Sequence, residues 1–503
     1  MGLLDLPPEI LDLIIDITAP DGIESFVLSC KAIHQRAKSQ IARHNELKRK
    51  WCHTTNASPA LRGNTLNILY EISRDPIIAE YIETLSLWDR RTEEEVIPDL
   101  NGYDFREDDS AMRGIKSLLQ SAEYYAMADR DEWWRQIQEE DAVGEDTSID
   151  KLYATVALLA LLPNVKVLQL PDRWHEVRKG EAAQSLVQAV ETLINTSNAS
   201  LRRLRPLGSL ETILPFVEEG YDVRAGLQCL QPFMCLSSIR NLFAVSCVAT
   251  EDDWGNVPLE WPNPHHKSPL TRIELASCCI DAHGLSVLVA NTPALTIFRY
   301  SHQTKWDGLE SDDWNPGEFQ QVLANHCGDQ LLELAITIDE LHGAVINGLS
   351  SFLRFPKLQK LEVDVIPFCG PPVESGQRLG LFAHVPDGAA PWVYTDIPCM
   401  GEMLPDSICE LQVNTEYPEP SKQALWALFK NIKSQKIERL VNLDRVVIRQ
   451  YGASTAFAMA TDHGAIFEAF DEDSTTPRSR AMMPEWKRQF DTHVGGIIMT
   501  TRE

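Results

Sequence analysis

The sequence predicts an α/β protein, with a small three-helix N-terminal module followed by an irregular solenoid. In the solenoid, parallel strands line the concave face and helices lie outside. One observation behind this prediction is that the pattern apolar-x-x-apolar-x-apolar recurs along residues 82–448, with helix-like stretches between many copies. The other is that the first 50 residues have only helical periodicity.

The N-terminal module, residues 1–50, is expected to form three short helices. Pro7 and Pro8 suit the first turn of a helix, where a missing N–H costs nothing. Apolar residues then recur at helical spacing until Pro20-Asp21-Gly22 breaks the pattern. A second apolar stretch follows, and residues 34–50 form a more polar, basic helix. Fifty residues cannot bury this many apolar side chains alone, so a partner or an adjacent domain is expected to cover them.

This module resembles an F-box. The matching residues are Leu6-Pro7-x-Glu9-Ile10-x-x-x-Ile14-x-x-Ile17 and Phe26-Val27-x-Ser29-Cys30-Lys31-x-Ile33. F-boxes dock on the Skp adaptor of SCF-type cullin–RING ubiquitin ligases, so the resemblance implies adaptor docking. It assigns the adaptor-facing or hairpin-core set to Leu6, Pro7, Ile10, Ile14, Ile17, Phe26, Cys30 and Ile33. The alternative is that these helices only cap the repeats that follow.

The repeated pattern predicts a strand at each of nine sites. The middle apolar residues of the nine copies are Leu85, Leu168, Leu242, Ile273, Phe298, Leu334, Leu361, Leu411 and Val446. A degraded tenth copy falls at Leu201-x-x-Leu204. Helices are expected at residues 152–162, 182–194, 285–290, 318–324 and 424–432. The array resembles leucine-rich repeats with loose spacing, and an α/β domain of another topology is the alternative.

The chain therefore divides into four regions and two interruptions. The expected regions are an F-box-like module (1–50), a helical linker or cap (51–81), an irregular leucine-rich-repeat-like solenoid (82–470) and a C-terminal tail (471–503). The interruptions are an acidic insertion (89–150), with a helix over 110–140, and a loop rich in proline and glycine (366–403).

Charge and composition exclude several classes of function. The 503 residues carry 46 Lys and Arg against 73 Asp and Glu, a net charge of −27. Such a surface repels nucleic acid and anionic membranes, so neither is an expected partner, and a protein target with a basic segment fits better. The 11 scattered cysteines, without a C-x-x-C pair or a readable targeting segment, favour reduced thiols in the cytoplasm or nucleus.

No motif indicates catalysis, a metal or a cofactor, so we expect a non-enzymatic protein without cofactors. The pairs His265-His266 and Cys278-Cys279 fit zinc spacing poorly. Tryptophans beside acidic residues follow several predicted strands, and they could hold a peptide carrying Lys or Arg. Alternatively, they pack long loops onto the array. The candidate target-binding residues are Trp174, Trp254, Trp261, Trp306, Trp314, Asp252, Asp253, Asp312 and Asp313.

Taken together, these features predict a substrate-recognition subunit of an SCF-type ubiquitin ligase. The N-terminal module would dock on the Skp adaptor, and the repeats would hold a target protein. A non-catalytic interaction scaffold, whose N-terminal helices act only as a cap, is the alternative. An enzyme with an unrecognised site has no support beyond abundant carboxylates.

Overall fold

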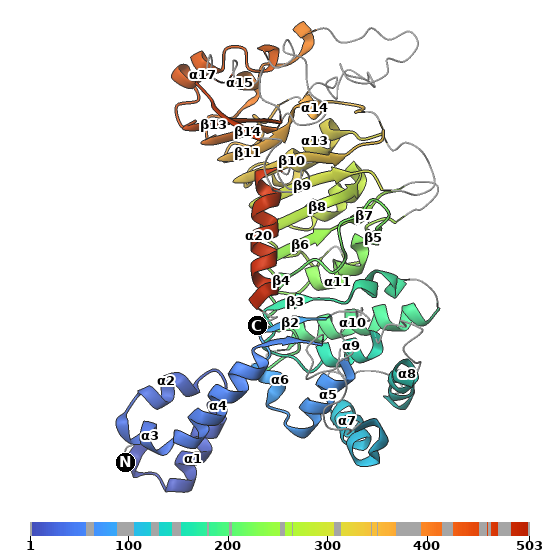
Figure 1. Cartoon of the computed structure of the whole chain (residues 1–503), viewed down its shortest axis with the longest axis vertical. Coiled ribbons are helices and arrows are strands. Elements are labelled where there is room, and N and C mark those ends of the chain that lie inside the picture. The colour runs from blue at the N-terminus through green and yellow to red at the C-terminus, as the bar shows by residue number, and fades with distance from the viewer. Residues whose placement is uncertain are drawn as a thin grey trace. The chain divides into compact units, whose positions relative to one another are not determined.

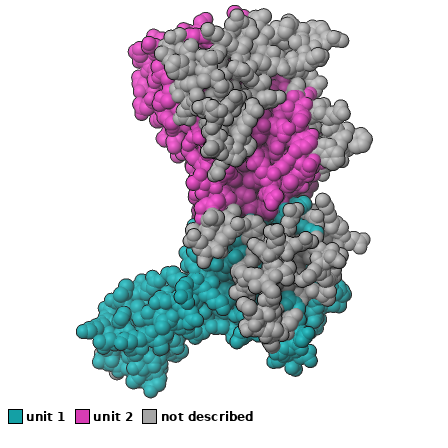
Figure 2. Space-filling view, in the orientation of Figure 1, with its two compact units in different colours: residues 1–211, 497–503 teal, residues 212–496 magenta. Residues whose placement is uncertain are grey.

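The computed structural model is an α/β protein with a large, open parallel sheet and many helices (Figure 1). It describes residues 3–56, 65–87, 105–121, 130–142, 152–178, 181–200, 204–251, 257–263, 265–305, 313–343, 345–349, 351–368, 394–414, 426–451, 460, 464–470 and 484–500. The chain forms two compact units: unit 1 is residues 1–211 with 497–503, and unit 2 is residues 212–496 (Figure 2). The division therefore falls inside the region expected as one array.

Unit 1 begins with the helical module and continues with a small parallel sheet. The module contains α1 (Pro8–Ile17), α2 (Ile23–Leu28), α3 (Lys31–Arg36) and α4 (Lys38–Trp51), after a short 3₁₀ turn η1 (Leu3–Asp5). Three parallel strands follow, β1 (His53–Thr55), β2 (Thr84–Ser86) and β3 (Val167–Gln169). The other helices are α5 (Thr65–Arg74), α6 (Ile78–Tyr81), α7 (Asp109–Ser121), α8 (Arg130–Ala142), α9 (Leu152–Leu159) and α10 (Glu181–Ala199).

Unit 2 is built on parallel strands paired in chain order. Its main sheet contains β4 (Thr212–Ile213), β6 (Asn241–Val245), β8 (Arg272–Ile280), β9 (Ile297–Gln303), β10 (Glu333–Glu340), β11 (Lys360–Asp364), β12 (Glu410–Asn414), β13 (Arg445–Tyr451) and β14 (Ile466–Phe470). Two short strands, β5 (Ala225–Gly226) and β7 (Cys247–Ala249), extend a side ladder onto β8. The described helices include α11 (Gln231–Met234), α12 (Ala282–Ala290), α13 (Pro316–Cys327), α14 (Val365–Phe368), α15 (Met400–Met403), α17 (Ile432–Glu438) and α20 (Glu485–Thr500), whose residues up to 496 belong to this unit.

The nine strands predicted from the repeated pattern are confirmed, and their anchor residues lie in register. In unit 2 the middle anchors pair from strand to strand in the order Leu242, Ile273, Phe298, Leu334, Leu361, Leu411 and Val446. In unit 1, Leu85 pairs with Leu168 in the same way. Since each anchor is buried, the pattern marks one continuous apolar face of the sheet in each unit.

The sheet of unit 2 has two faces, which differ in their side chains and in the helices that pack on them. Anchor side chains of β9 contact α13, because Phe319 lies 4.7 Å from Tyr300 and 6.2 Å from Phe298 between ring centroids. The residues between the anchors point to the opposite face. There Thr337 accepts a hydrogen bond from Trp486 of α20. The anchors therefore face helices such as α13, and the intervening residues face α20.

Several expectations differ from the structure. The degraded copy does not give a strand at Leu204, which is an exposed bend, and the strand lies instead at β4, after Pro206. Proline has no N–H for a ladder, which explains why that copy failed. The second expected stretch is divided between α2 and α3. The expected basic helix over 34–50 begins in α3 and continues as α4 after a break at Ala37, where the backbone (φ −79°, ψ 11°) leaves helical geometry.

The two interruptions and the tail also contain regular structure. Helices α7 and α8 lie within the acidic insertion, where one helix over 110–140 was expected. Part of the proline- and glycine-rich loop, residues 369–393, lies outside the described residues. The C-terminal segment expected as a tail forms helix α20. Strands β1 and β14 carried no repeat pattern and were not predicted.

Candidate protein-docking site

The site begins with the local structure of α1. Pro7 occupies the N-cap position and Pro8 the first turn, as expected from their missing N–H groups. Leu11 and Ile15, four residues apart, are the buried residues of this helix, so they lie on one face. The helix ends at Ile17, before the Pro20-Asp21-Gly22 segment.

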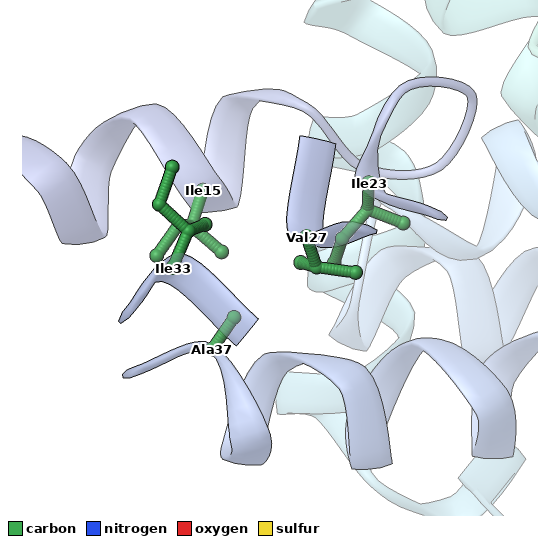
Figure 3. Close-up of a cluster of buried hydrophobic side chains, with 5 residues drawn as sticks. All are labelled: Ile15, Ile23, Val27, Ile33 and Ala37. Atoms are coloured by element: carbon green, nitrogen blue, oxygen red, sulfur yellow. The ribbon is translucent and has the colours of Figure 1, made fainter. Parts of the chain in front are cut away.

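A compact core holds α1, α2 and α3 together (Figure 3). Its buried members are Ile15 of α1, Ile23 and Val27 of α2, Ile33 of α3 and Ala37 at the α3–α4 junction. Phe26 and Cys30 are half-buried and pack against it. The Cys30 Sγ also accepts the backbone N–H of Ile33 at 3.5 Å, which caps α3. Of the residues assigned to the adaptor-facing or hairpin-core set, Phe26, Cys30 and Ile33 therefore belong to the core.

The remaining members of that set lie at or near the surface. Pro7, Ile10 and Ile17 are exposed, and Leu6 and Ile14 are half-buried. Leu13 is also exposed, at 54%, although the sequence reasoning did not name it. Ile10, Leu13 and Ile17 follow the i, i+3, i+7 spacing of a single helix face, which was the signal available for finding Leu13.

α1 thus has two apolar faces, one in the core and one exposed. We call Ile10, Leu13 and Ile17 the exposed α1 stripe; their exposed fractions are 43%, 54% and 70%. Among the described residues, eleven large apolar side chains are exposed, and six of them fall between Leu3 and Leu28. Exposed apolar side chains concentrated in so short a segment are typical of a docking surface rather than of scattered surface residues.

Ion pairs fix the geometry of the helices around this stripe. Arg36 of α3 makes two hydrogen bonds to the Asp12 carboxylate of α1, each 2.7 Å, and a third to the Pro8 carbonyl at 2.8 Å. The bidentate pairing raises the pKa of Arg36. On the other side of the module, Lys48 of α4 bonds Glu24 of α2 at 2.7 Å and lowers the pKa of that carboxyl.

Helix α4 joins the module to the rest of unit 1. Its His44 is buried, and the Nδ1 atom lies 2.9 Å from the Tyr81 hydroxyl of α6. Arg43 pairs with Asp75 at 2.8 Å. Trp51, at the end of α4, is 2% exposed. The module is therefore anchored through α4, while the exposed stripe belongs to α1.

The tryptophans expected to bind a target are divided by the structure. Trp174 and Trp314 are buried, at 1% and 3% exposure, so they pack within their own units and are not presented to a partner. The Trp314 ring stacks on His302 at 4.5 Å, and burial lowers the pKa of His302 to about 3, so this imidazole is neutral. Trp261 is half-buried, with its indole N–H donating to the His266 carbonyl.

The acidic residues near those tryptophans are placed only in part. Asp313 is exposed. Trp254, Trp306, Asp252, Asp253 and Asp312 lie outside the described residues. The structure therefore does not assemble the expected aromatic and acidic edge from the residues that it describes.

The described part of the chain offers no metal-binding cluster of three or more His, Cys, Asp or Glu side chains. His265 and His266 are exposed, whereas Cys278 and Cys279 are buried within β8. None of the described helices combines the length and apolar character needed to cross a bilayer.

A scan against models of known protein families found no match to this chain, and a search of the curated proteins found none. The resemblance of the N-terminal module to F-boxes therefore remains a prediction from its own residues.

Proposed function

We propose that this chain is a non-catalytic substrate-recognition subunit of an SCF-type ubiquitin ligase, acting in the cytoplasm or nucleus. The N-terminal module docks on the Skp adaptor, and the region of parallel strands, an irregular leucine-rich-repeat-like solenoid, binds a target protein. Ubiquitin transfer belongs to other subunits, and this chain contributes proximity and orientation.

The exposed α1 stripe is the observation that supports adaptor docking best. The module already has a complete core of its own, yet Ile10, Leu13 and Ile17 remain exposed on the opposite side of α1. Full burial of one such side chain is worth about 1.5–3 kcal/mol. A partner that covers the stripe would gain a substantial part of its binding free energy there.

Co-purification tests the proposal directly. The full chain, mixed with a recombinant Skp adaptor, is expected to elute as one stoichiometric complex in size-exclusion chromatography. A Leu6→Ala/Pro7→Ala/Ile10→Ala variant is expected to bind more weakly, because it removes apolar contact area at the start of α1. Separate elution of the wild-type chain and the adaptor would reject adaptor docking.

The anchoring of α4 favours a second candidate, an interaction scaffold whose first helices only cap unit 1. The buried Trp51 and the His44–Tyr81 contact are what a cap would need. Hydrogen exchange separates the two functions. Amides of α1–α3 protected as strongly as those of β2 would favour the cap, and amides that open much more easily would favour a docking module.

A further inference from the structure

Helix α20 lies on the polar face of the unit 2 sheet and runs across its strands (Figure 1). Residues Glu485–Gln489 alone contact side chains of β8, β9, β10, β11 and β13. Farther along, Phe490 meets Phe243 of β6 at 5.8 Å between ring centroids. One helix thus covers most of the strands that carry the repeated pattern.

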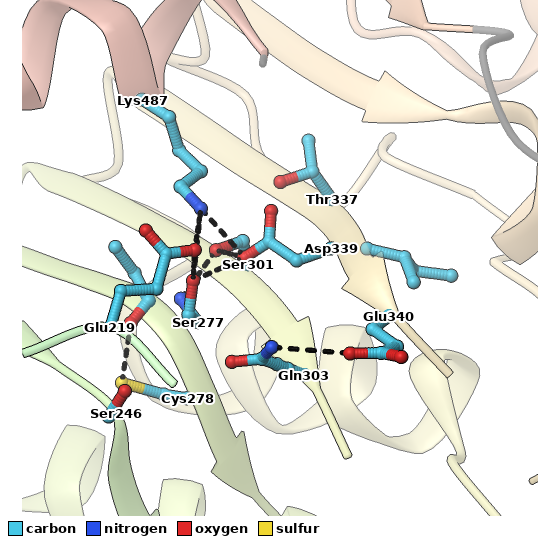
Figure 4. Close-up of polar contacts among 12 residues, drawn as sticks. Glu219, Ser246, Ser277, Cys278, Ser301, Gln303, Thr337, Asp339, Glu340 and Lys487 are labelled. Atoms are coloured by element: carbon cyan, nitrogen blue, oxygen red, sulfur yellow. Dashed lines mark hydrogen bonds and ion pairs between the residues drawn. The ribbon is translucent and has the colours of Figure 1, made fainter. Parts of the chain in front are cut away.

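A lysine of this helix sits in a socket of acidic and hydroxyl groups (Figure 4). The Lys487 Nζ lies 2.9 Å from Asp339, 3.0 Å from Glu219 and 2.9 Å from the Ser277 hydroxyl. Ser277 and Ser301 also donate hydrogen bonds to Asp339, at 2.8 Å and 2.5 Å. The side chain of Lys487 is 2% exposed. Burial acts to lower its pKa, but the Asp339 and Glu219 carboxylates outweigh burial and raise the pKa.

The N-terminus of α20 is capped by a side chain of strand β11. The Glu362 carboxylate of β11 accepts the backbone N–H groups of Glu485 at 2.7 Å and Trp486 at 3.0 Å. Negative charge at a helix N-terminus is favourable, because the first N–H groups have no partner within the helix. The Trp486 indole N–H donates to Thr337 at 3.1 Å, and Arg449 pairs with Glu485 at 2.6 Å.

The surface beneath α20 is more polar and more charged than the anchor face of the same sheet. Apolar residues such as Phe243, Ala276, Ala335 and Val447 lie on this face. The other strand residues that face α20 are polar or charged, and they include Glu274, Arg299, Ser301, Thr337, Asp339, Glu362, Asp364, Gln412, Asn414 and Arg449. Among the described residues, Glu274 Oε2 is buried on this face without a hydrogen-bond partner. Burying such groups is costly, and a permanent cover would be at least as stable if both sides were apolar.

We propose that the sheet face under α20 is the surface on which this chain binds its target protein. The target presents a short helix with a lysine next to a tryptophan and an aromatic side chain one turn later. Helix α20 occupies the surface when no target is bound. This inference rests on the proposed function, because the target is the protein that the substrate-recognition subunit would bind.

The charge and the hydrogen-bonding groups of this face select the partner. The socket of Asp339 and Glu219 needs a cation, and Thr337 offers an acceptor to an indole N–H. Both needs are met by adjacent residues of α20, Trp486 and Lys487, and the aromatic Phe490 follows one turn later. A target helix must displace α20, which belongs to the same chain and therefore competes at an advantage over a free helix.

A labelled peptide with the sequence of residues 484–500 tests the surface in the full chain. Two proteins are compared, the wild type and a Trp486→Ala/Lys487→Ala variant that loosens its own α20. The variant is expected to bind the peptide at least about tenfold more tightly than the wild type, because competition from the tethered helix is weakened.

Two altered peptides test whether the lysine of the helix determines binding. A peptide with Lys487→Glu is expected to bind the variant at least about tenfold more weakly, since it places a carboxylate in an acidic socket. A peptide with Thr492→Ala, changed at an exposed position of α20, serves as the matched control and is expected to bind like the parent peptide.

Two outcomes would overturn the inference. One is a folded variant that does not bind the peptide. The other is a variant that loses its circular dichroism signal, because such unfolding would mean that α20 is an integral layer of unit 2. Hydrogen exchange of the wild type gives a second reading that needs no variant. Amides of residues 486–496 are expected to exchange about a hundredfold faster than those of β9 and β10, whereas equal rates would contradict a displaceable helix.

No adaptor is present in these assays, so they are independent of the F-box. A chain that binds the peptide but not the Skp adaptor would overturn the receptor function and keep the surface. A chain that binds the adaptor but not the peptide would do the reverse.

Discussion

Ile15 and Ile17 offer a matched pair for testing the two faces of α1. Both are isoleucines on one helix, two residues apart, but Ile15 is 1% exposed and Ile17 is 70% exposed. Ile15→Ala removes buried atoms from the cluster with Ile33 and leaves a cavity, which costs about 2–5 kcal/mol. Ile17→Ala loses only the buried fraction of its side chain, so its cost is about 1 kcal/mol or less.

Hydrogen exchange read by mass spectrometry measures both variants in the full chain. The free energy of opening of α1–α3 follows from the exchange rates of their amides. Ile15→Ala is expected to lower it by about 2 kcal/mol or more, and Ile17→Ala to leave it within about 1 kcal/mol of wild type.

Equal losses for the two variants would refute the reasoning, because they would mean that Ile17 is covered by the chain itself. The same result would remove the exposed α1 stripe as a docking surface. A loss confined to Ile15→Ala would leave the stripe free for a partner.

Two further predictions concern buried polar groups. Burial raises the pKa of Asp364 to about 8, so its contribution to stability is present below the pKa of the unfolded chain and is lost as the pH rises toward 8. Asp364→Asn removes that pH dependence. Denaturant titrations should therefore show the variant gaining stability relative to wild type between pH 5 and about pH 8. A stability difference that stays constant over this pH range would argue against the raised pKa of Asp364. Tyr81→Phe removes the partner of the His44 Nδ1 atom and should cost about 1–3 kcal/mol in thermal unfolding, whereas no loss would show that this contact is not what anchors α4.

The strands that the sequence predicted are those with a strong local signal. Leu334 and Ile336 of β10, for example, belong to a spacing in which alternate residues are apolar and buried, and this spacing alone marks a strand. β4 is two residues long and follows Pro206, so it has too few residues to show any period. Short strands of this kind depend on the neighbour with which they pair, here β6.

The position of α20 could not be predicted, because it depends on residues far apart in the sequence. Glu362 caps a helix that begins 123 residues later, and Asp339 meets Lys487 from another strand. No local pattern reports such a contact. The tryptophans show the same difficulty, since Trp314 could be an exposed anchor or a buried one until its stacking on His302 is known.

The most direct test of the central claim measures adaptor binding by calorimetry with the exposed α1 stripe altered in the full chain. An Ile10→Ser/Leu13→Ser/Ile17→Ser variant is compared with Ile437→Ser/Val441→Ser, which changes apolar residues of unit 2 that are 76% and 69% exposed. Loss of the stripe is expected to weaken binding to the Skp adaptor by about tenfold or more, with the control variant unchanged. Wild-type affinity in the stripe variant would contradict the claim that this face of α1 is where the adaptor docks.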